Sequence, residues 1–356
     1  MKARTLVQVL APIILLSKIF GMQPYIVRKK RLRVSLIRLI YTTACLSIYL
    51  WHVYLSLRRA NNVGKMSSMM VKSFGWTLLI FVIVLTGRDV FAKILQASDK
   101  LVKVDMTLAR FRQKDLLECN YQHRRYLLVL ILINGVYNLI SEIFVKLTGR
   151  HGAVDFFVNF TYPRIVISVV NVKFFLLMII IKSRFKIIND VLKDKVGFVE
   201  LVETHKTLRH ITNTLNSAFS LYLLLLLTQS FLMTLVDLHS TLYMILFQSF
   251  VAKFQTIFIT IKNCFIYCFD LCFLTTISSN LCSEANLTRN CVLGLELDIN
   301  NEKSRNQIVA SVLRLMNYKL EIKACRLFVI DKAFLFTIFG GVCSYVFIML
   351  QMDMQS

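Results

Sequence analysis

Long apolar blocks, separated by segments rich in lysine and arginine, dominate this sequence of 356 residues. A run of about 18 or more apolar residues with few charges is long enough to cross a bilayer as a helix. Hydrophobic residues make up 56% of the chain and the mean hydropathy is +0.61, well above a soluble domain. Only three prolines and 11 glycines interrupt the blocks. The pattern therefore predicts an all-α membrane protein with long, largely unbroken helices.

The blocks divide into seven expected spans. A shorter apolar run at 6–16 precedes them, but Pro12 interrupts it, it is too short to span, and no signal-peptide cleavage site follows. We expect it to be an interfacial or re-entrant segment, and we expect the sixth span to continue below the membrane as helix to about Cys282. The spans are predicted at 34–57, 73–92, 126–146, 160–181, 218–236, 242–270 and 333–352.

The distribution of positive charge gives the orientation. Segments 1–33, 88–125, 182–217 and 284–327 together hold 31 lysines and arginines, whereas the alternate segments hold six. Cytoplasmic loops of membrane proteins collect lysine and arginine. Seven spans then place the N-terminus inside the cell and the C-terminus outside.

Two of the inside segments show apolar residues at helical spacing, which predicts long cytosolic helix extensions. They are 182–217 and 302–328, and in the second Ser304 and Gln307 form a capping-box pattern. We favour a packed cytosolic bundle over solvated amphipathic loops. The expected organisation is an N-terminal cytosolic or interfacial segment 1–33, spans one to five in 34–236, span six in 237–283, a cytosolic anchor segment 284–332 and a final helix 333–356.

Composition also argues against several functions. The formal charge is +23, and the lysines and arginines lie mainly between the apolar blocks. They are not interleaved with aromatic residues, and no DNA-binding motif occurs, so we expect no nucleic-acid partner. Cys264, Cys268 and Cys272 share a helical face, but cysteines in an apolar helix are typical small buried hydrophobes, so we expect no metal. No catalytic motif occurs, and we expect neither an enzyme nor a cofactor.

The last span carries the most specific motif. Ser344-Tyr345, five apolar residues and then Gln351-Met352 resemble the C-terminal signature of insect gustatory receptors, which reads Thr-Tyr, five apolar residues, Gln-Phe. Two positions depart conservatively, with Ser344 for threonine and Met352 for phenylalanine. Chain length, seven spans, an inside N-terminus and long cytosolic segments add to the resemblance.

This resemblance implies a ligand-gated cation channel in the plasma membrane of chemosensory neurons. Its partners would be membrane lipid, permeating cations, a small-molecule tastant and related subunits, because the family is expected to form homotetramers or heterotetramers around a central pore. Sugar-sensing relatives tend to carry glutamate directly after the signature tyrosine, and Val346 stands there instead. The chain therefore looks more like a receptor for bitter or repellent compounds.

The final helix has residues suited to a pore. One helical face, with residues at three- and four-residue steps, changes from small to large apolar side chains. This face holds Gly341, Ser344, Ile348 and Met352. Such a face can form a hydrophobic constriction that gates by dewetting, and an acidic residue near the outer mouth would favour cations. The predicted pore and gate residues are Gly341, Ser344, Tyr345, Ile348, Gln351, Met352 and Asp353.

Polar residues collect in the expected outer halves of spans three to six, where they are costly unless they face protein or water. They could line a ligand pocket or serve as hydrogen bonds between helices, and both interpretations stay open. Glu142 and Arg164 could pair across spans three and four or reach the headgroups. The ligand-binding candidates are Asn138, Ser141, Glu142, Tyr162, Arg164, Ser168, Gln229, Tyr243 and Gln248.

Three other functions compete with a ligand-binding channel. A G-protein-coupled receptor also has seven spans, but it needs the opposite orientation, and no Asp-Arg-Tyr or Asn-Pro-x-x-Tyr motif occurs. A secondary transporter is expected to show repeated halves and helices broken by glycine or proline, which are not visible. A co-receptor subunit that does not itself bind ligand remains compatible with the sequence.

Overall fold

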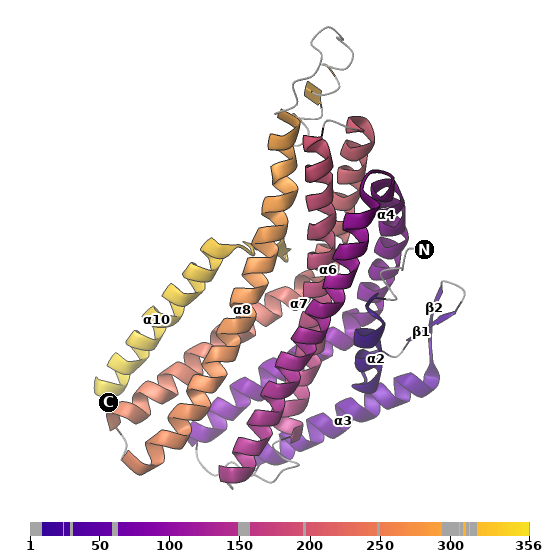
Figure 1. The fold of residues 1–356 in the computed structure, drawn as a ribbon. Helices are drawn as coiled ribbons and strands as arrows, with labels where there is room; N and C mark the ends of the chain where they lie inside the picture. Colours follow the sequence, from indigo (N-terminus) through magenta and orange to yellow (C-terminus); the bar gives the residue numbers. More distant parts are fainter. Residues whose placement is uncertain are drawn as a thin grey trace.

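Helices form almost all of the computed structural model, which describes residues 9–23, 25–28, 31–58, 63–148, 157–194, 197–247, 250–293, 306, 309, 310, 313 and 319–355 (Figure 1). By length and composition, five described helical stretches could cross a membrane. They are Leu36–Arg58, Tyr162–Lys193, Phe198–Tyr243, Asn263–Val292 and Lys332–Met354. The helices are α2 (Ala11–Ile19), α3 (Leu36–Arg58), α4 (Val63–Thr148), the π-helix η1 (Phe157–Thr161), α6 (Tyr162–Lys193), α7 (Phe198–Phe247), α8 (Phe250–Leu293) and α10 (Lys332–Gln355).

Helix α4 contains both the second and the third predicted span. It runs for 86 residues, so the basic segment between 73–92 and 126–146 is itself helical. The helix is interrupted at Arg112, whose φ of −143° and ψ of 71° lie outside the helical region. The Arg112 guanidinium reaches Asp194 at 2.7 Å, which ties this kink to the end of α6.

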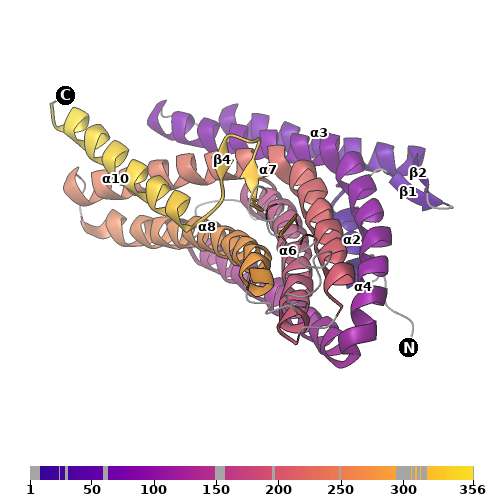
Figure 2. The same cartoon turned by 90° about the horizontal axis from the view of Figure 1, so that it is seen from above.

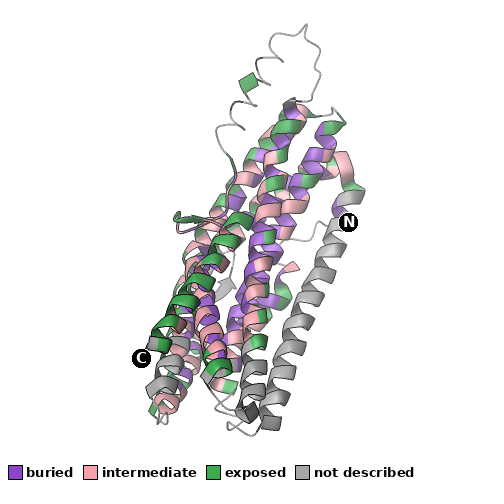
Figure 3. Cartoon of the chain, turned by 90° about the vertical axis from the view of Figure 1, so that its left-hand side faces the viewer, coloured by how far each residue is buried: buried purple, intermediate pink, exposed green. Residues whose placement is uncertain are grey.

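Helix α6 is the core of the fold. Figure 2 shows it enclosed by α4, α7 and α8, and 78% of its most apolar stretch is buried. The corresponding fractions are 17% for α3 and 11% for α10, so these two helices lie at the periphery. Figure 3 shows the same contrast, with buried residues inside the bundle and exposed residues along α10. Apolar helices with exposed faces are expected to meet lipid or further protein.

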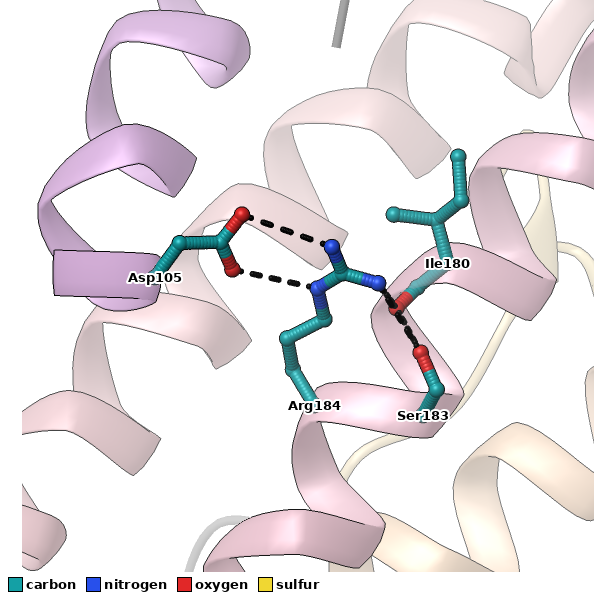
Figure 4. A network of polar contacts seen from close by, with 4 residues as sticks. All are labelled: Asp105, Ile180, Ser183 and Arg184. Carbon is teal, nitrogen blue, oxygen red and sulfur yellow. Dashed lines mark hydrogen bonds and ion pairs between the residues drawn. The ribbon is translucent and has the colours of Figure 1, made fainter. Parts of the chain in front are cut away.

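A buried ion pair joins α4 to α6 (Figure 4). The Arg184 guanidinium donates from Nε to Asp105 Oδ1 at 3.1 Å and from a terminal nitrogen to Oδ2 at 3.3 Å. Its other terminal nitrogen donates to Ile180 O and Ser183 Oγ. The two side chains are only 3% and 8% exposed. Because both charges have left water, their paired geometry with these additional hydrogen bonds is what makes burial tolerable.

The predicted continuous helix over 182–217 is wrong in one respect, because a turn divides it. Helix α6 ends at Lys193 and α7 begins at Phe198. Gly197 between them has a φ of +67°, and a Cβ at this position would lie 2.5 Å from Phe111 Cζ. Glycine is therefore required both for the backbone conformation and for the close approach of α4.

The predicted boundary between the fifth and sixth spans is also wrong. Residues 237–241, expected to be an outer loop, are helical within α7, which continues to Phe247. No glycine or proline occurs there to end the helix, and Thr241 Oγ1 bonds to Asp237 O inside it. Helix α8 begins at Phe250 and extends to Leu293, beyond the predicted end near Cys282.

The helix expected over 302–328 is only partly present. Positions 306, 309, 310 and 313 are helical, but 319–322 are not, and a hairpin of β3 (Lys323–Ala324) and β4 (Phe328–Val329) follows. Side chains of distant helices supply its hydrogen bonds. Asn286 bonds to both the N–H and the C=O of Leu320, Asn216 does the same at Lys323, and Ser220 Oγ accepts from Cys325 N.

The expected re-entrant run near the N-terminus contains the short helix α2, with Pro12 in its first turn. Leu10, Ile13 and Ile14 are buried. Tyr41 and Tyr162 donate to the carbonyls of Ile19 and Phe20, which fasten α2 to α3 and α6. An antiparallel pair not predicted from sequence follows, β1 (Tyr25–Arg28) with β2 (Arg31–Val34).

We expect the Asp105–Arg184 pair to be necessary for the helix core. Asp105→Asn or Arg184→Met should each lower the free energy of unfolding by about 3–5 kcal/mol, because the remaining group is left buried without its partner. Replacing both with apolar residues (Asp105→Leu with Arg184→Met) should recover most of the loss. The measurement is thermal unfolding of the purified protein.

As a control, Arg110→Met breaks the exposed pair with Glu200 and should lower the free energy of unfolding by less than about 1 kcal/mol. Equal effects at both pairs would contradict the structural role of Arg184.

Candidate pore helix and polar cluster

Helix α10 has two chemically different faces. Ile338, Val342 and Val346 are buried, at four-residue steps, against the bundle. Residues two positions away lie about 200° around a helix. Ser344 is accordingly exposed, and Ile348 and Met352 are 50% and 66% exposed. Three of the four residues predicted to share the pore face therefore point away from the rest of the chain, whereas the fourth, Gly341, lies against Phe231 of α7.

Part of α10 packs against an aromatic residue of α7. A Cβ added at Gly341 would lie 3.5 Å from Phe231 Cε2, and the ring of Tyr345 meets Phe231 edge-on at 6.2 Å. Tyr345 thus contacts α7, although it was predicted among the pore and gate residues. At Gly340 a Cβ would meet nothing within 4 Å in the described part of the chain. Ser344 Oγ bonds back to Gly340 O at 3.0 Å.

A polar contact fastens the C-terminal end of α10 to α7. His239 Nε2 lies 2.8 Å from Asp353 Oδ2, with side chains 20% and 33% exposed. The neighbouring Gln351 is exposed. Sequence reasoning missed this contact because the two residues are 114 positions apart. Asp353 consequently brings its charge to the end of α10 in a position fixed by a histidine.

The candidates on α6 face different neighbours. The guanidinium of Arg164 lies 5.4 Å from the centre of the Tyr267 ring on α8, a cation–π geometry. The ring of Tyr162 instead lies 5.8 Å from that of Tyr49 on α3, tilted by 44°, and its hydroxyl donates to Phe20 O. Ser168 is partly buried one turn after Arg164. Arg164 and Ser168 are therefore on the side toward α8, whereas Tyr162 contributes to the attachment of α2 and α3.

The two described candidates on α7 are also apart. Gln229 is 5% exposed and lies over Gly75 of α4, where an added Cβ would come within 1.5 Å of its Oε1. Its Nε2 has no hydrogen-bond partner among the described residues. Tyr243 was assigned to the sixth span, but it belongs to α7 and is 39% exposed beside His239.

The remaining candidates cannot be placed with their neighbours. Asn138, Ser141 and Glu142 lie in α4, but their side chains fall outside the described part of the structure, as does Gln248 altogether. A pairing of Glu142 with Arg164 therefore stays a prediction. Among the described residues, a hydrogen bond that was not predicted from the sequence joins α7 to α6. The Tyr222 hydroxyl of α7 donates to Asn171 Oδ1 of α6 at 2.7 Å.

Comparison with known proteins gives consistent matches. The sequence model described as 7tm Chemosensory receptor matches residues 10–356. Gustatory receptor 28b of Drosophila melanogaster is 25% identical over 177 residues, which span 48% of this chain and only 38% of that protein. The structure is similar to that of the insect olfactory receptor OR5 from Machilis hrabei, with a TM-score of 0.76, 13% identity and 98% of each chain covered. The same receptor in complex with eugenol gives a TM-score of 0.72 with the same identity and coverage.

The contact between Gly341 and Phe231 should tolerate only a small side chain. We expect Gly341→Ala to be accepted, and Gly341→Leu to lower the free energy of unfolding by about 1–3 kcal/mol through overpacking against the ring. Phe231→Ala in the same chain should recover part of that loss by making room. Thermal unfolding of the purified variants measures this. If Phe231→Ala and Gly341→Leu simply add, α10 does not pack on α7 in the way described.

Proposed function

The chain belongs to the 7tm chemosensory receptor family, and we propose that it is a gustatory-type receptor that works as a ligand-gated, non-selective cation channel. The family match confirms the resemblance seen in the last span. In this proposal a small extracellular tastant, bitter or repellent rather than sugar, opens the channel in the plasma membrane of chemosensory neurons. Four subunits, identical or related, surround the pore.

The observation that carries this proposal is the exposed face of α10. Ile348 and Met352 are large apolar side chains that are 50% and 66% exposed. A helix in that state needs lipid, other subunits or a pore beside it. The signature motif and the alternation of faces favour a pore, with the two side chains narrowing it to a hydrophobic constriction.

The charge distribution supports the orientation of the channel. With 31 lysines and arginines in the segments proposed to be inside and six in those proposed to be outside, the C-terminal end of α10 faces the exterior. Asp353 then lies near the outer mouth, where the contact with His239 holds its carboxylate. Four such groups would favour cations over anions.

The ligand is proposed to bind among the outer parts of α4, α6, α7 and α8. Arg164 and Ser168 supply polar groups on the side of α6 that faces α8, and Tyr267 supplies an aromatic surface. Asn138, Ser141, Glu142 and Gln248 complete the proposed set. Convergent polar groups among aromatic neighbours suit a small molecule of mixed character.

The gate can be tested without knowing the ligand. Ile348→Ala or Met352→Ala should widen the constriction and raise the resting cation leak. A barrier lowered by about 1.4 kcal/mol would raise it about tenfold. The measurement is whole-cell current in the absence of added compound, normalised to the amount of protein at the cell surface.

Val342→Ala is the matched control, because Val342 lies on the packed face of the same helix and is 2% exposed. It should leave the normalised leak unchanged. Currents that stay at background in both gate variants, with normal surface levels, would remove these residues from the gate. A leak that rises equally with Val342→Ala would indicate general loosening of α10.

A further inference from the structure

A lysine is buried in α6, and no described residue places an opposite charge beside it. Lys173 is 7% exposed, and among the described residues it makes no hydrogen bond or ion pair. An unpaired charge inside a protein is unfavourable, so such a side chain either gives up its proton or meets an anion. It lies five residues after Ser168, roughly 8 Å along the helix, and its cavity is lined by none of the residues of the proposed tastant region.

Lys173 lines a cavity of about 30 Å³ between the chain after α2 and helices α4, α6 and α7. That is room for roughly two water molecules. No carboxylate is among the lining residues. The cavity thus combines an amine, a limited volume and a lining without a carboxylate, and a bound anion would hold the amine in its charged form.

The other polar residues of the cavity define which hydrogen bonds are available. Tyr222 already donates its hydroxyl proton to Asn171, and Thr86 donates to Val82 O. Gln23, 5% exposed, has no hydrogen bond within the described part of the chain. Among the described residues of the lining, the side-chain donors without a partner are therefore the amine of Lys173 and the amide nitrogen of Gln23, and both are suited to a carboxylate oxygen.

The rest of the wall is apolar. It is formed by Met22, Ile83, Val90, Phe91, Ile94, Val170 and Phe219. A carboxylate that is attached to a hydrocarbon would meet the donors with its head and the apolar surface with its first carbons. A phosphate ester has a bulkier head than a carboxylate and would exceed a volume of this size.

We propose that this cavity is a binding site for the carboxylate group of a small or amphiphilic acid, held by Lys173 and Gln23 and distinct from the tastant region and the pore helix. The carboxylate can come from a membrane fatty acid or from a short acid in solution. The site goes beyond the proposed channel function, since α10 contributes no residue to it.

Binding of radiolabelled oleate to the purified full-length protein in nanodiscs tests the proposal. We expect saturable binding that Lys173→Met weakens about tenfold or more, because a charged hydrogen bond is lost. Lys173→Arg should retain most of it. Lys182→Met, which removes a lysine of the same helix outside the cavity lining, should bind as the unchanged protein does. Oleate should also raise the melting temperature of the unchanged protein and not that of Lys173→Met.

Competitors identify the chemistry and its source. Oleyl alcohol, which has the same chain without the charge, should compete poorly. Full competition by acetate would support a soluble acid as the ligand, and its failure would support a membrane fatty acid. Equal binding by Lys173→Met, equal competition by oleyl alcohol, or stronger competition by dioleoyl phosphatidic acid would each overturn the proposal. No current is measured, so failure here is distinguishable from failure of the channel function.

Discussion

The buried pair of Asp105 and Arg184 is the interaction on which the helix core depends. It holds α4 against α6, and α6 is the helix that the rest of the core encloses. Removing both charges from water would be costly, but the guanidinium also finds Ile180 O and Ser183 Oγ, so its donors are used. Helices α7 and α8 pack on this core and in turn carry α10. The position of the final helix therefore follows from polar contacts far from it as well as from apolar burial.

The apolar blocks made the helices predictable, but not all of their ends. Residues 237–241 lie between two predicted spans, and we therefore expected an outer loop there. They contain no glycine or proline to end a helix, and α7 continues through them to Phe247. The apolar spacing of 302–328 failed for another reason. Its last part is extended because Asn286, Asn216 and Ser220 bond to its backbone, and such long-range partners leave no local trace. Tertiary contacts here override a helical pattern.

The candidate site shows the same division. Three- and four-residue spacing predicted one face for Gly341 and three later residues. Ser344, Ile348 and Met352 do lie together on the exposed side of α10, but Gly341 packs against Phe231. Which side of the helix packs, and that Asp353 meets His239, depended on residues more than a hundred positions away. The spacing of Arg164 and Ser168 was readable, whereas the separation of Tyr162 from them required the positions of α2 and α3.

Accessibility of single cysteines to a charged, membrane-impermeant maleimide tests most directly whether the exposed face of α10 meets water rather than lipid. All nine native cysteines are first replaced by serine, and a single cysteine is then placed at 344, 348, 346 or, on peripheral α3, at 40. We expect labelling at Ser344→Cys and Ile348→Cys, with little at Val346→Cys, which is packed, or at Ile40→Cys, which is 60% exposed on an apolar helix. Unreactive Ser344→Cys and Ile348→Cys in folded surface protein would place that face in lipid and contradict the pore.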